Sequence, residues 1–429
     1  MRVAFTTLGC KVNQYETENL SELFAADGFE VVDPSDFADV YVINSCTVTA
    51  SGDKKTRQLL RRLKKQNPAA VAALTGCFPQ AFPDAAEAIP EADVITGSSN
   101  RGDVLPAVKE ALATGKRVVR ILPHERGEKF EHMSVTGLRG RTRAFVKIED
   151  GCDRYCSYCI IPKARGPVRS KPLNEIREEL SALAENGYRE VVLVGVNLSS
   201  YGKEIGLRLI DAVQAACRTE GIRRVRLGSL EPELLTAEDI RAMAAEEKFC
   251  PQFHLSLQSG CDKTLREMNR HYDSAEYARI VSDIRAAFEN PSITTDVMVG
   301  FAGETEADFE ESLAFVQKIG FAKVHVFSYS RRPGTSADKR SGQVPSSVKE
   351  ERSRRMIEAT DATRKQFLLG QLGKTEEVLV ETTKSPLGYE GFTKNYTPVY
   401  VNCDPALCGN VVKMRLEAVL EGHCVGTLL

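Results

Sequence analysis

Three cysteines stand close together near the middle of the chain, in the run Gly151-Cys152-Asp153-Arg154-Tyr155-Cys156-Ser157-Tyr158-Cys159. At this Cys-x3-Cys-x2-Cys spacing, each thiolate can bind one iron of a cubane 4Fe–4S cluster. The fourth iron then has no protein ligand, so a small molecule can chelate it. A zinc site is the alternative, but structural zinc is almost always held by four Cys or His ligands. Neither residue type occurs between Ile160 and Glu179, so the spacing favours the iron–sulfur cluster.

A second set of cysteines, Cys10, Cys46 and Cys77, lies in the first part of the chain. Each follows a run of residues typical of a β-strand by a few positions. These runs are Arg2–Leu8, Asp39–Asn44 and Ala70–Thr75. Because sites in open α/β sheets assemble at the ends of the strands, the three thiols can converge on one point. The alternative is three buried, inert thiols, but their regular placement after successive strands favours convergence.

The chain as a whole has the character of a cytoplasmic protein. No apolar run is long enough to span a bilayer, and residues 1–9 lack the apolar core of a signal peptide. We therefore expect a cytoplasmic location, where thiols stay reduced. There the twelve cysteines indicate metal binding or catalysis more than disulfides. The net charge of −2 gives no general sign of nucleic-acid binding, so any such surface must be local.

The elements that must position these cysteines form an α/β fold in three parts. Residues 1–122 alternate strands with helices near Tyr15–Ala26 and Lys54–Gln66, which predicts a domain built on a parallel sheet. Residues 123–143 are rich in Gly, Arg and Glu and are predicted to be a linker.

Residues 144–366 contain a second α/β series. Its six expected strands are Ala144–Glu149, Glu190–Val196, Arg223–Leu230, Gln252–Leu257, Ile293–Val299 and Lys323–Tyr329. Their spacing suits βα units, and six units predict a parallel barrel that is open on one side.

The last part, residues 367–429, follows a charged segment of helical pattern, Val348–Gly373. It alternates apolar and polar residues between turns, which predicts a small antiparallel β module. Its expected strands are Val378–Thr382, Thr397–Val401, Val411–Ala418 and His423–Leu428.

The Cys-x3-Cys-x-Tyr-Cys run at the first strand of a six-unit α/β series resembles the radical S-adenosylmethionine (SAM) superfamily. The resemblance implies that the open iron of a 4Fe–4S cluster at Cys152, Cys156 and Cys159 binds SAM. An electron from the cluster then cleaves SAM to methionine and a 5′-deoxyadenosyl radical. The aromatic ring of Tyr158 is expected to pack beside the adenosine.

The runs Leu8-Gly9-Cys10-Lys11-Val12-Asn13-Gln14, Asn44-Ser45-Cys46 and Thr75-Gly76-Cys77 resemble the methylthiotransferase branch of that superfamily, and the likeness covers essentially the whole chain. It implies that Cys10, Cys46 and Cys77 hold a second 4Fe–4S cluster and that the C-terminal module is a TRAM-like RNA-binding domain. It also implies that the radical takes hydrogen from C2 of an adenine, that a sulfur at the second cluster adds there, and that a second SAM supplies the methyl group. Arg165 matches the family's Ala-Arg-Gly run and is assigned with these three cysteines to catalysis. The expected partners are tRNA and an electron-donor protein, and a monomer is expected.

Three branches of the family act on different substrates: threonylcarbamoyladenosine at position 37 of tRNA, isopentenyladenosine in tRNA, and an aspartate of a ribosomal protein. The runs Gly9–Thr17, Asp150–Pro162 and Gly195–Gly202 resemble the threonylcarbamoyl branch most. That substrate carries a carboxylate, which a planar guanidinium can hold bidentately. Arg331 and Arg332, after the last expected barrel strand, are the candidates, although both could be ordinary charges at the rim.

Further SAM contacts are expected at the strand ends of the barrel, where such folds build their sites. The candidates are Asn197, Ser229, Glu231, Gln258 and Asp296. For RNA, the run Lys54–Lys65 carries seven basic residues and no acidic one, which suits phosphate binding but also an ordinary solvated helix face. Two other functions stay open, namely a single-cluster radical SAM enzyme and a zinc-dependent RNA-binding protein without catalysis.

Overall fold

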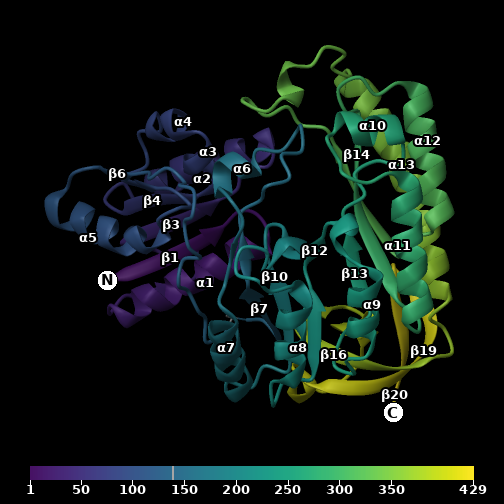
Figure 1. The fold of residues 1–429 in the computed structure, drawn as a ribbon. Helices are drawn as coiled ribbons and strands as arrows, with labels where there is room; N and C mark the ends of the chain where they lie inside the picture. The colour runs from purple at the N-terminus through teal and green to yellow at the C-terminus, as the bar shows by residue number, and fades with distance from the viewer. Residues whose placement is uncertain (138–139) are drawn as a thin grey trace.

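The computed structural model describes residues 1–137 and 140–429. Its first part is a six-stranded parallel sheet in the order β2-β1-β3-β4-β5-β6 (Figure 1). The strands are β1 (Arg2–Thr7), β2 (Glu30–Val32), β3 (Val40–Ser45), β4 (Val71–Gly76), β5 (Val94–Thr96) and β6 (Val118–Arg120). The three predicted strands are confirmed as β1, β3 and β4, which occupy neighbouring positions in the sheet. The other three have only three residues each, too few for a recognisable alternation.

Helices cover both faces of this sheet. They are α1 (Lys11–Ala26), α2 (Ala50–Gln66), α3 (Cys77–Ala81), α4 (Pro83–Glu87) and α5 (Val104–Thr114). Leu60 and Leu63 of α2 pack on one face of the sheet, whereas Leu20 of α1 and Val108 of α5 pack on the other. Because both faces are covered, strands such as β3 are buried at every residue. The basic side chains of α2 therefore lie on the outer surface of one face.

The central part contains the six predicted strands. They are β7 (Arg143–Lys147), β10 (Glu190–Val194), β11 (Arg224–Leu227) with β12 (Ser229–Leu230), β13 (Gln252–Leu255), β14 (Ser292–Val299) and β15 (Lys323–Ser328). The third strand is interrupted at Gly228, so that β11 pairs with β10 and β12 pairs with β13. All pairs are parallel, and β7 and β15 are the two edge strands. This is the open partial barrel predicted from the sequence.

Helices surround the outside of the barrel and complete the βα units (Figure 1). The long ones are α7 (Leu173–Glu185), α8 (Leu209–Arg218), α9 (Ala237–Ala244), α11 (Ser274–Ala287), α12 (Glu306–Ile319) and α13 (Ser346–Leu369). The short elements are β8 (Glu149–Asp150), α6 (Ile161–Arg165), β9 (Arg169–Ser170) and α10 (Asp262–Glu267). Thr236 and Thr305 begin α9 and α12 with capping boxes, in which the side chains of Asp239 and Asp308 bind the cap residues in return.

The segment predicted as a linker packs between the first two parts. Its described residues form no helix or strand after β6 and before β7. However, Met133 and Val135 are buried in the core of the barrel together with Val12 and Tyr15 of α1. The Tyr15 hydroxyl donates to the Met133 carbonyl oxygen at 2.9 Å. Helix α1 of the N-terminal part therefore packs into the core of the barrel beside this segment.

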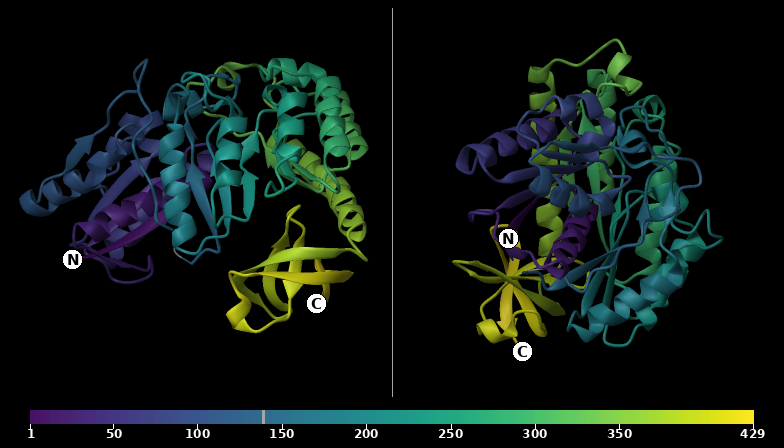
Figure 2. Two further views of the ribbon diagram at one scale, coloured as in Figure 1. Left: turned by 60° about the horizontal axis from the view of Figure 1, so that its bottom comes forward. Right: turned by 90° about the vertical axis from the view of Figure 1, so that its left-hand side faces the viewer.

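The C-terminal part is a closed five-stranded barrel in the order β16-β17-β18-β20-β19, seen below the central strands in Figure 2. Its strands are β16 (Thr375–Ser385), β17 (Gly388–Thr393), β18 (Pro398–Val401), β19 (Val411–Leu420) and β20 (His423–Leu428). Four strands match the prediction, whereas β17 was not predicted because Gly388 and Gly391 weaken its pattern. The pairs are antiparallel except β18 with β20, which closes the barrel in parallel.

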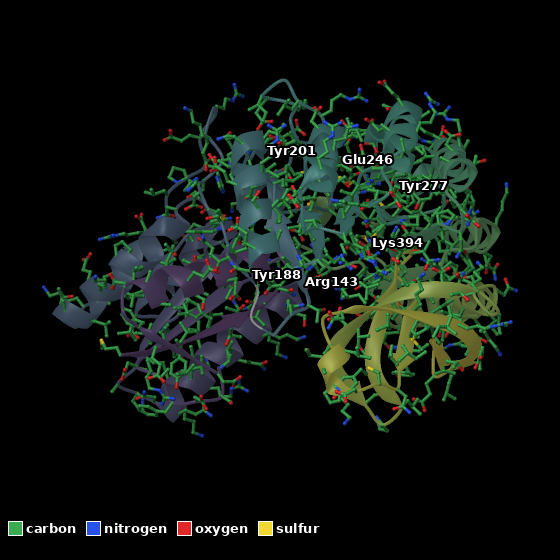
Figure 3. The ribbon with its side chains drawn as sticks, turned by 90° about the horizontal axis from the view of Figure 1, so that it is seen from below. Arg143, Tyr188, Tyr201, Glu246, Tyr277 and Lys394 are labelled. Atoms are coloured by element: carbon green, nitrogen blue, oxygen red, sulfur yellow. The ribbon has the colours of Figure 1, made fainter. Side chains whose placement is uncertain are left out.

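Buried arginines attach this barrel to the central strands. Arg226 of β11 donates to the carbonyl oxygens of Thr393 and Lys394, each at 2.7 Å, and its Nε pairs with Glu190 at 2.6 Å. Arg143, labelled in Figure 3, also reaches the C-terminal barrel, where its guanidinium lies over the rings of Phe392 and Tyr396. The bonds from Arg226 end on backbone carbonyl oxygens of the C-terminal barrel, so they hold that barrel in one orientation against the central strands. Among the described residues, none of the helices is long and apolar enough to cross a membrane.

Candidate functional site

The loop of Cys152, Cys156 and Cys159 begins directly after β8. Gly151 precedes it with a φ of +88°, and a Cβ at this position would collide with the carbonyl oxygen of Pro167, so only glycine fits. The Cys159 amide donates to the Cys156 carbonyl oxygen at 2.9 Å, which folds the loop into a tight turn. Burial raises the pKa of the Cys159 thiol to about 12. A buried thiol of this kind becomes a thiolate when it binds a metal.

A cavity of about 410 Å³ opens beside this loop. Cys156 and Cys159 line it on one side, and Gly334 and Thr335, which follow β15, line it on the other. The Ser157 carbonyl oxygen accepts from the Ala337 amide at 2.8 Å, which holds the two sides together. The cavity therefore offers room next to two of the three thiols.

Sequence reasoning did not identify Arg270, which contacts this site. Its Nη1 lies 3.3 Å from Sγ of Cys156, and its Nη2 lies 2.5 Å from a carboxylate oxygen of Glu231. Its Nε donates to the Tyr272 hydroxyl at 3.1 Å, and only 4% of the side chain is exposed. The sequence around Arg270 has no pattern that would distinguish it as buried among the 57 Lys and Arg residues of the chain.

The second group of cysteines follows the ends of the adjacent strands β1, β3 and β4, as predicted. A Cβ on Gly9 would lie 3.0 Å from Cβ of Cys46, so the loop bearing Cys10 touches the loop bearing Cys46. Burial, together with the nearby thiols of Cys46 and Cys10, raises the pKa of Cys77 to about 12 against the lowering effect of Arg165. Cys77 is buried, Cys46 is half-buried and Cys10 is exposed. The three thiols thus converge with one open side.

Arg165 joins the two groups of cysteines. It ends α6, the helix that follows Cys159, and its Nε donates to Sγ of Cys77 at 3.1 Å. Its Nη2 donates to Oδ1 of Asn13 at 2.9 Å. Helix α6 packs directly on α3, and Ala164 and Ile160 form one buried apolar cluster with Cys77 there. Cys77 therefore lies in this helix-to-helix contact, and the loop of Cys152, Cys156 and Cys159 leads directly into it.

A buried cluster of charges surrounds Arg165. Glu16 of α1 pairs with Arg101 at 2.9 Å, with Lys147 at 2.8 Å and with Arg165. Asp150, which ends β8, pairs with Lys147 at 2.6 Å and with Arg101 at 3.1 Å. Residues of the N-terminal sheet and of the barrel alternate in this cluster, so the ion pairs lock the two parts together next to both groups of cysteines.

The donor sets fit iron–sulfur clusters better than single metal ions. Among the residues that the structure describes, no three or more His, Cys, Asp and Glu side chains gather closely enough to bind one metal ion. Each cysteine of a cubane binds a different iron, so its three sulfurs need not meet at one point. Three thiols on one short loop beside an open cavity, and three thiols at neighbouring strand ends, both suit that requirement.

The predicted SAM contacts occupy different surroundings. Ser229 is exposed, and Glu231 lies beside it within reach of Arg270. Gln258, with a φ of +65°, follows the end of β13, and its amide donates to the carbonyl oxygen of Asp296 at 2.8 Å. Asp296 itself lies within β14 and not at the strand end where it was predicted. Two others are engaged otherwise: Asn197 is buried and binds Ser200 within its own turn at 2.7 Å, and the Tyr158 ring packs on Phe301.

The two rim arginines differ. Arg332 is buried, and its Nη2 donates to Asp53 and to Thr47, each at 2.7 Å. Its guanidinium therefore binds the N-terminal part just after Cys46, and it is not free to hold a substrate in this arrangement. Arg331 is exposed and pairs with Asp338 at 3.0 Å, so of the two it alone remains a candidate for binding the substrate.

Glu149, also missed from the sequence, leads to a prediction about pH. Burial raises the pKa of its carboxyl well above the ordinary value, although the Asn197 amide donates to it at 2.7 Å. Because the pKa of Glu149 is higher in the folded than in the unfolded protein, its protonated form stabilises the fold. This stabilisation is complete below the pKa of the unfolded protein, about 4.3, and is lost as the pH rises. We therefore expect Glu149→Gln to gain stability over the wild type by up to about 1.4 kcal/mol per pH unit above that value.

Urea titrations of both proteins at pH 5.5 and 7.5, with equal cluster content, test this prediction. Glu185→Gln, at the exposed end of α7, is the control and should change little at either pH. A difference between Glu149→Gln and the wild type that is the same at both pH values would contradict a neutral Glu149.

Comparison with known proteins agrees with this geometry. The family model described as "Radical SAM superfamily" matches residues 146–316, and the one described as "Uncharacterized protein family UPF0004" matches residues 2–97. The threonylcarbamoyladenosine tRNA methylthiotransferase MtaB of Bacillus subtilis is 36% identical over 96% of this chain and 93% of its own. The tRNA-2-methylthio-N(6)-dimethylallyladenosine synthase of Pelotomaculum thermopropionicum is 34% identical over 98% and 96%.

A likeness in fold extends to more distant proteins. The radical SAM methyltransferase TsrM from Kitasatospora setae, whose structure contains cobalamin and a [4Fe-4S] cluster, has a TM-score of 0.57 over 79% of this chain and 74% of its own. At 13% identity, this likeness concerns the fold alone. The two tRNA-modifying relatives above are similar in sequence to this chain over nearly its full length. The chain therefore belongs to the radical SAM methylthiotransferase family.

Proposed function

We propose that this protein methylthiolates C2 of N6-threonylcarbamoyladenosine at position 37 of tRNA, with SAM as both radical source and methyl donor. The observation that carries the proposal is that Cys77 lies in the contact between α3 and α6, while the loop of Cys152, Cys156 and Cys159 leads directly into α6. One centre for generating the radical and one for delivering sulfur must act on the same nucleoside, and this arrangement brings both to one junction.

The family's cofactors are 4Fe–4S clusters and SAM, and the cysteines are their ligands in the proposal. Cys152, Cys156 and Cys159 hold the cluster that, when bound, supplies the electron for cleavage of SAM. Cys10, Cys46 and Cys77 hold the second cluster, where sulfur is delivered. The exposed Cys10 marks the open side of the second group, and the cavity beside Cys156 and Cys159 marks that of the first.

The names of both relatives specify tRNA, but they differ in the modified nucleoside and have nearly equal identity to this chain. Two features of the chain itself favour threonylcarbamoyladenosine. The choice between nucleosides therefore depends on local sequence, where the run Gly9–Thr17 resembles the threonylcarbamoyl branch. The exposed guanidinium of Arg331 can pair with the carboxylate of that nucleoside.

The decisive experiment supplies the anaerobically reconstituted protein with dithionite, SAM and tRNA bearing either threonylcarbamoyladenosine or isopentenyladenosine, and analyses the nucleosides by mass spectrometry. We expect about eight irons per chain and the mass gain of a methylthio group on threonylcarbamoyladenosine only. Product on isopentenyladenosine alone would assign the protein to the other tRNA branch. Cleavage of SAM without product on either tRNA would point to the ribosomal protein.

Helix α2 offers a surface for the RNA backbone. Its exposed side chains Lys54, Lys55, Arg62 and Lys65 form no ion pair within the described part of the chain. The N-terminus of α2 lies near the active site, because the Ala50 amide donates to Ser330 at 3.3 Å and Asp53 binds Arg332. Cationic side chains at this place can neutralise phosphates next to the modified nucleoside.

We expect replacement of Lys54 and Lys55 by alanine to weaken tRNA binding and to lower the slope of log K against log salt by about 0.7 to 0.9 per lost phosphate contact. Lys109→Ala is a matched control, since α5 lies on the opposite face of the N-terminal sheet. Filter-binding titrations between low and moderate salt measure both slopes. Equal slopes for the wild type and the double variant would exclude α2 from the RNA surface.

A further inference from the structure

Each of the two cysteine groups has one buried arginine with an N–H directed at a sulfur atom. For the first group it is Arg270, with Nη1 at 3.3 Å from Sγ of Cys156. For the second it is Arg165, with Nε at 3.1 Å from Sγ of Cys77. The two arginines come from unrelated places in the chain, one from the end of α6 and one from the loop after α10. The same contact therefore arises twice, independently.

The remaining contacts of both arginines fix these N–H groups in position. In Arg270, Nε binds Tyr272 and Nη2 binds Glu231, and the only partner of Nη1 among the described residues is the Cys156 sulfur. In Arg165, both Nη atoms bind Glu16, and Nε has only the Cys77 sulfur. Neither guanidinium can turn away without breaking a buried ion pair. The bonds to sulfur are thus held by groups that take no part in binding iron.

Charge explains what such a contact does. A guanidinium is always charged, and its bond to an anionic acceptor is roughly twice as strong as a neutral one. Inside a protein, where screening by water is weak, a fixed positive charge stabilises negative charge on a nearby sulfur. Reduction adds an electron to an iron–sulfur cluster, and hydrogen bonds to its sulfurs are one of the factors that set the reduction potential.

We propose that Arg270 and Arg165 are positioning residues for the two clusters, each holding one cysteine sulfur by a charge-assisted N–H···S bond and thereby raising the reduction potential of its own cluster. This inference rests on the proposed function, because it places the clusters at the two groups of cysteines. It gives Arg165 a role other than direct catalysis, since Arg165 contacts a ligand of the cluster and reaches the reaction through it.

Two proteins with one cluster each allow the potentials to be measured separately. In the first, Cys10, Cys46 and Cys77 are replaced by alanine, and in the second, Cys152, Cys156 and Cys159 are replaced. Arg270→Gln and Arg165→Gln are introduced into both, and redox titrations followed by electron paramagnetic resonance give the midpoint potentials. Each substitution should lower the midpoint potential of its own cluster by at least about 59 mV. For one electron, this corresponds to a tenfold change in the equilibrium constant for reduction. The potential of the other cluster should stay unchanged.

Arg101→Gln is the matched control for Arg165→Gln. Arg101 is buried in the same charge cluster and pairs with Glu16 and Asp150, but it does not contact a cysteine sulfur. Its removal should shift the potential of the second cluster by less than half as much. The double variant Glu16→Gln/Arg165→Gln removes one charge of each sign and keeps the test valid if Arg165→Gln alone folds poorly. Arg165→Lys and Arg270→Lys, which keep the charge, should recover part of each shift.

The outcomes separate the two proposals. Full iron content with potentials that do not move, or that move equally in Arg101→Gln, would overturn this inference and leave the proposed function standing. A shift of both clusters by either substitution would also overturn it, because the effect would not be local. A wild-type protein that binds iron at neither group of cysteines would overturn the proposed function and this inference with it.

Discussion

Replacement of Cys156 by alanine should abolish both cleavage of SAM and methylthiolation, whereas replacement of Cys10 should abolish methylthiolation and leave cleavage of SAM in place. The physical reason is that the two thiols belong to separate groups. Cys156 lines the cavity at the open side of the first group, and Cys10 lies at the open side of the N-terminal group. We expect Cys10→Ala to keep at least about a tenth of the wild-type cleavage rate, which corresponds to an increase of no more than about 1.4 kcal/mol in the activation barrier.

The two activities are measured in one reaction, 5′-deoxyadenosine by liquid chromatography and the modified nucleoside by mass spectrometry. Cys403→Ala is the control, because this half-buried thiol lies in the C-terminal barrel, and both activities should be unchanged. Methylthiolated product from Cys10→Ala at the wild-type rate would show that the second group is idle. 5′-Deoxyadenosine from Cys156→Ala would disprove the assignment of the first cluster.

Local patterns were sufficient to predict the elements that carry the cysteines. Long buried runs such as Val40–Ser45 read as strands because a sheet covered on both faces requires apolar residues at every position. The three-residue strands β2, β5 and β6 could not be predicted, since they are defined by pairing with a neighbouring strand and not by a pattern of their own. Strand β17 could not be predicted for a similar reason, because it depends on closure of the C-terminal barrel.

The contacts that hold the site together could not be predicted, because they join residues far apart in the chain. Arg165 reaches Glu16 across 149 positions, and Arg332 reaches Asp53 across 279. Arg332 was expected at the substrate, since its place after the last barrel strand suited that role. The structure instead pairs it with a carboxylate of the neighbouring part. Only the packing of the N-terminal sheet against the barrel decides which arginine stays exposed.

The largest effect on stability is expected for Glu16→Gln. This carboxylate is fully buried between Arg101, Lys147 and Arg165. Burial alone would raise its pKa, but the three cations lower the pKa to about 2. Removing one partner from a buried ion cluster leaves cations uncompensated, which costs about 3–5 kcal/mol. At neutral pH we therefore expect the free energy of unfolding of Glu16→Gln to fall by that amount.

The pH dependence of this loss follows from the lowered pKa. Stability from a carboxylate with a lowered pKa is complete above the unfolded value of about 4.3 and is lost as the pH falls towards the folded value. The difference between wild type and Glu16→Gln should therefore be constant from pH 7 to about pH 5 and shrink below it. Urea titrations across this range measure it. Glu87→Gln, at an exposed position of α4, is the control and should stay within about 0.5 kcal/mol of wild type.

The double variant Glu16→Gln/Arg101→Gln separates loss of charge balance from loss of packing. It removes one anion and one cation from the cluster, so it should recover part of the stability lost in Glu16→Gln, as a pair of coupled residues does. A double variant that is less stable than the sum of the two single changes, or a Glu16→Gln protein within about 1 kcal/mol of wild type, would contradict the assigned role of the cluster. Because Arg165 connects this cluster to Cys77, a confirmed loss would mean that the charges joining the N-terminal sheet to the barrel also hold the second group of cysteines in place.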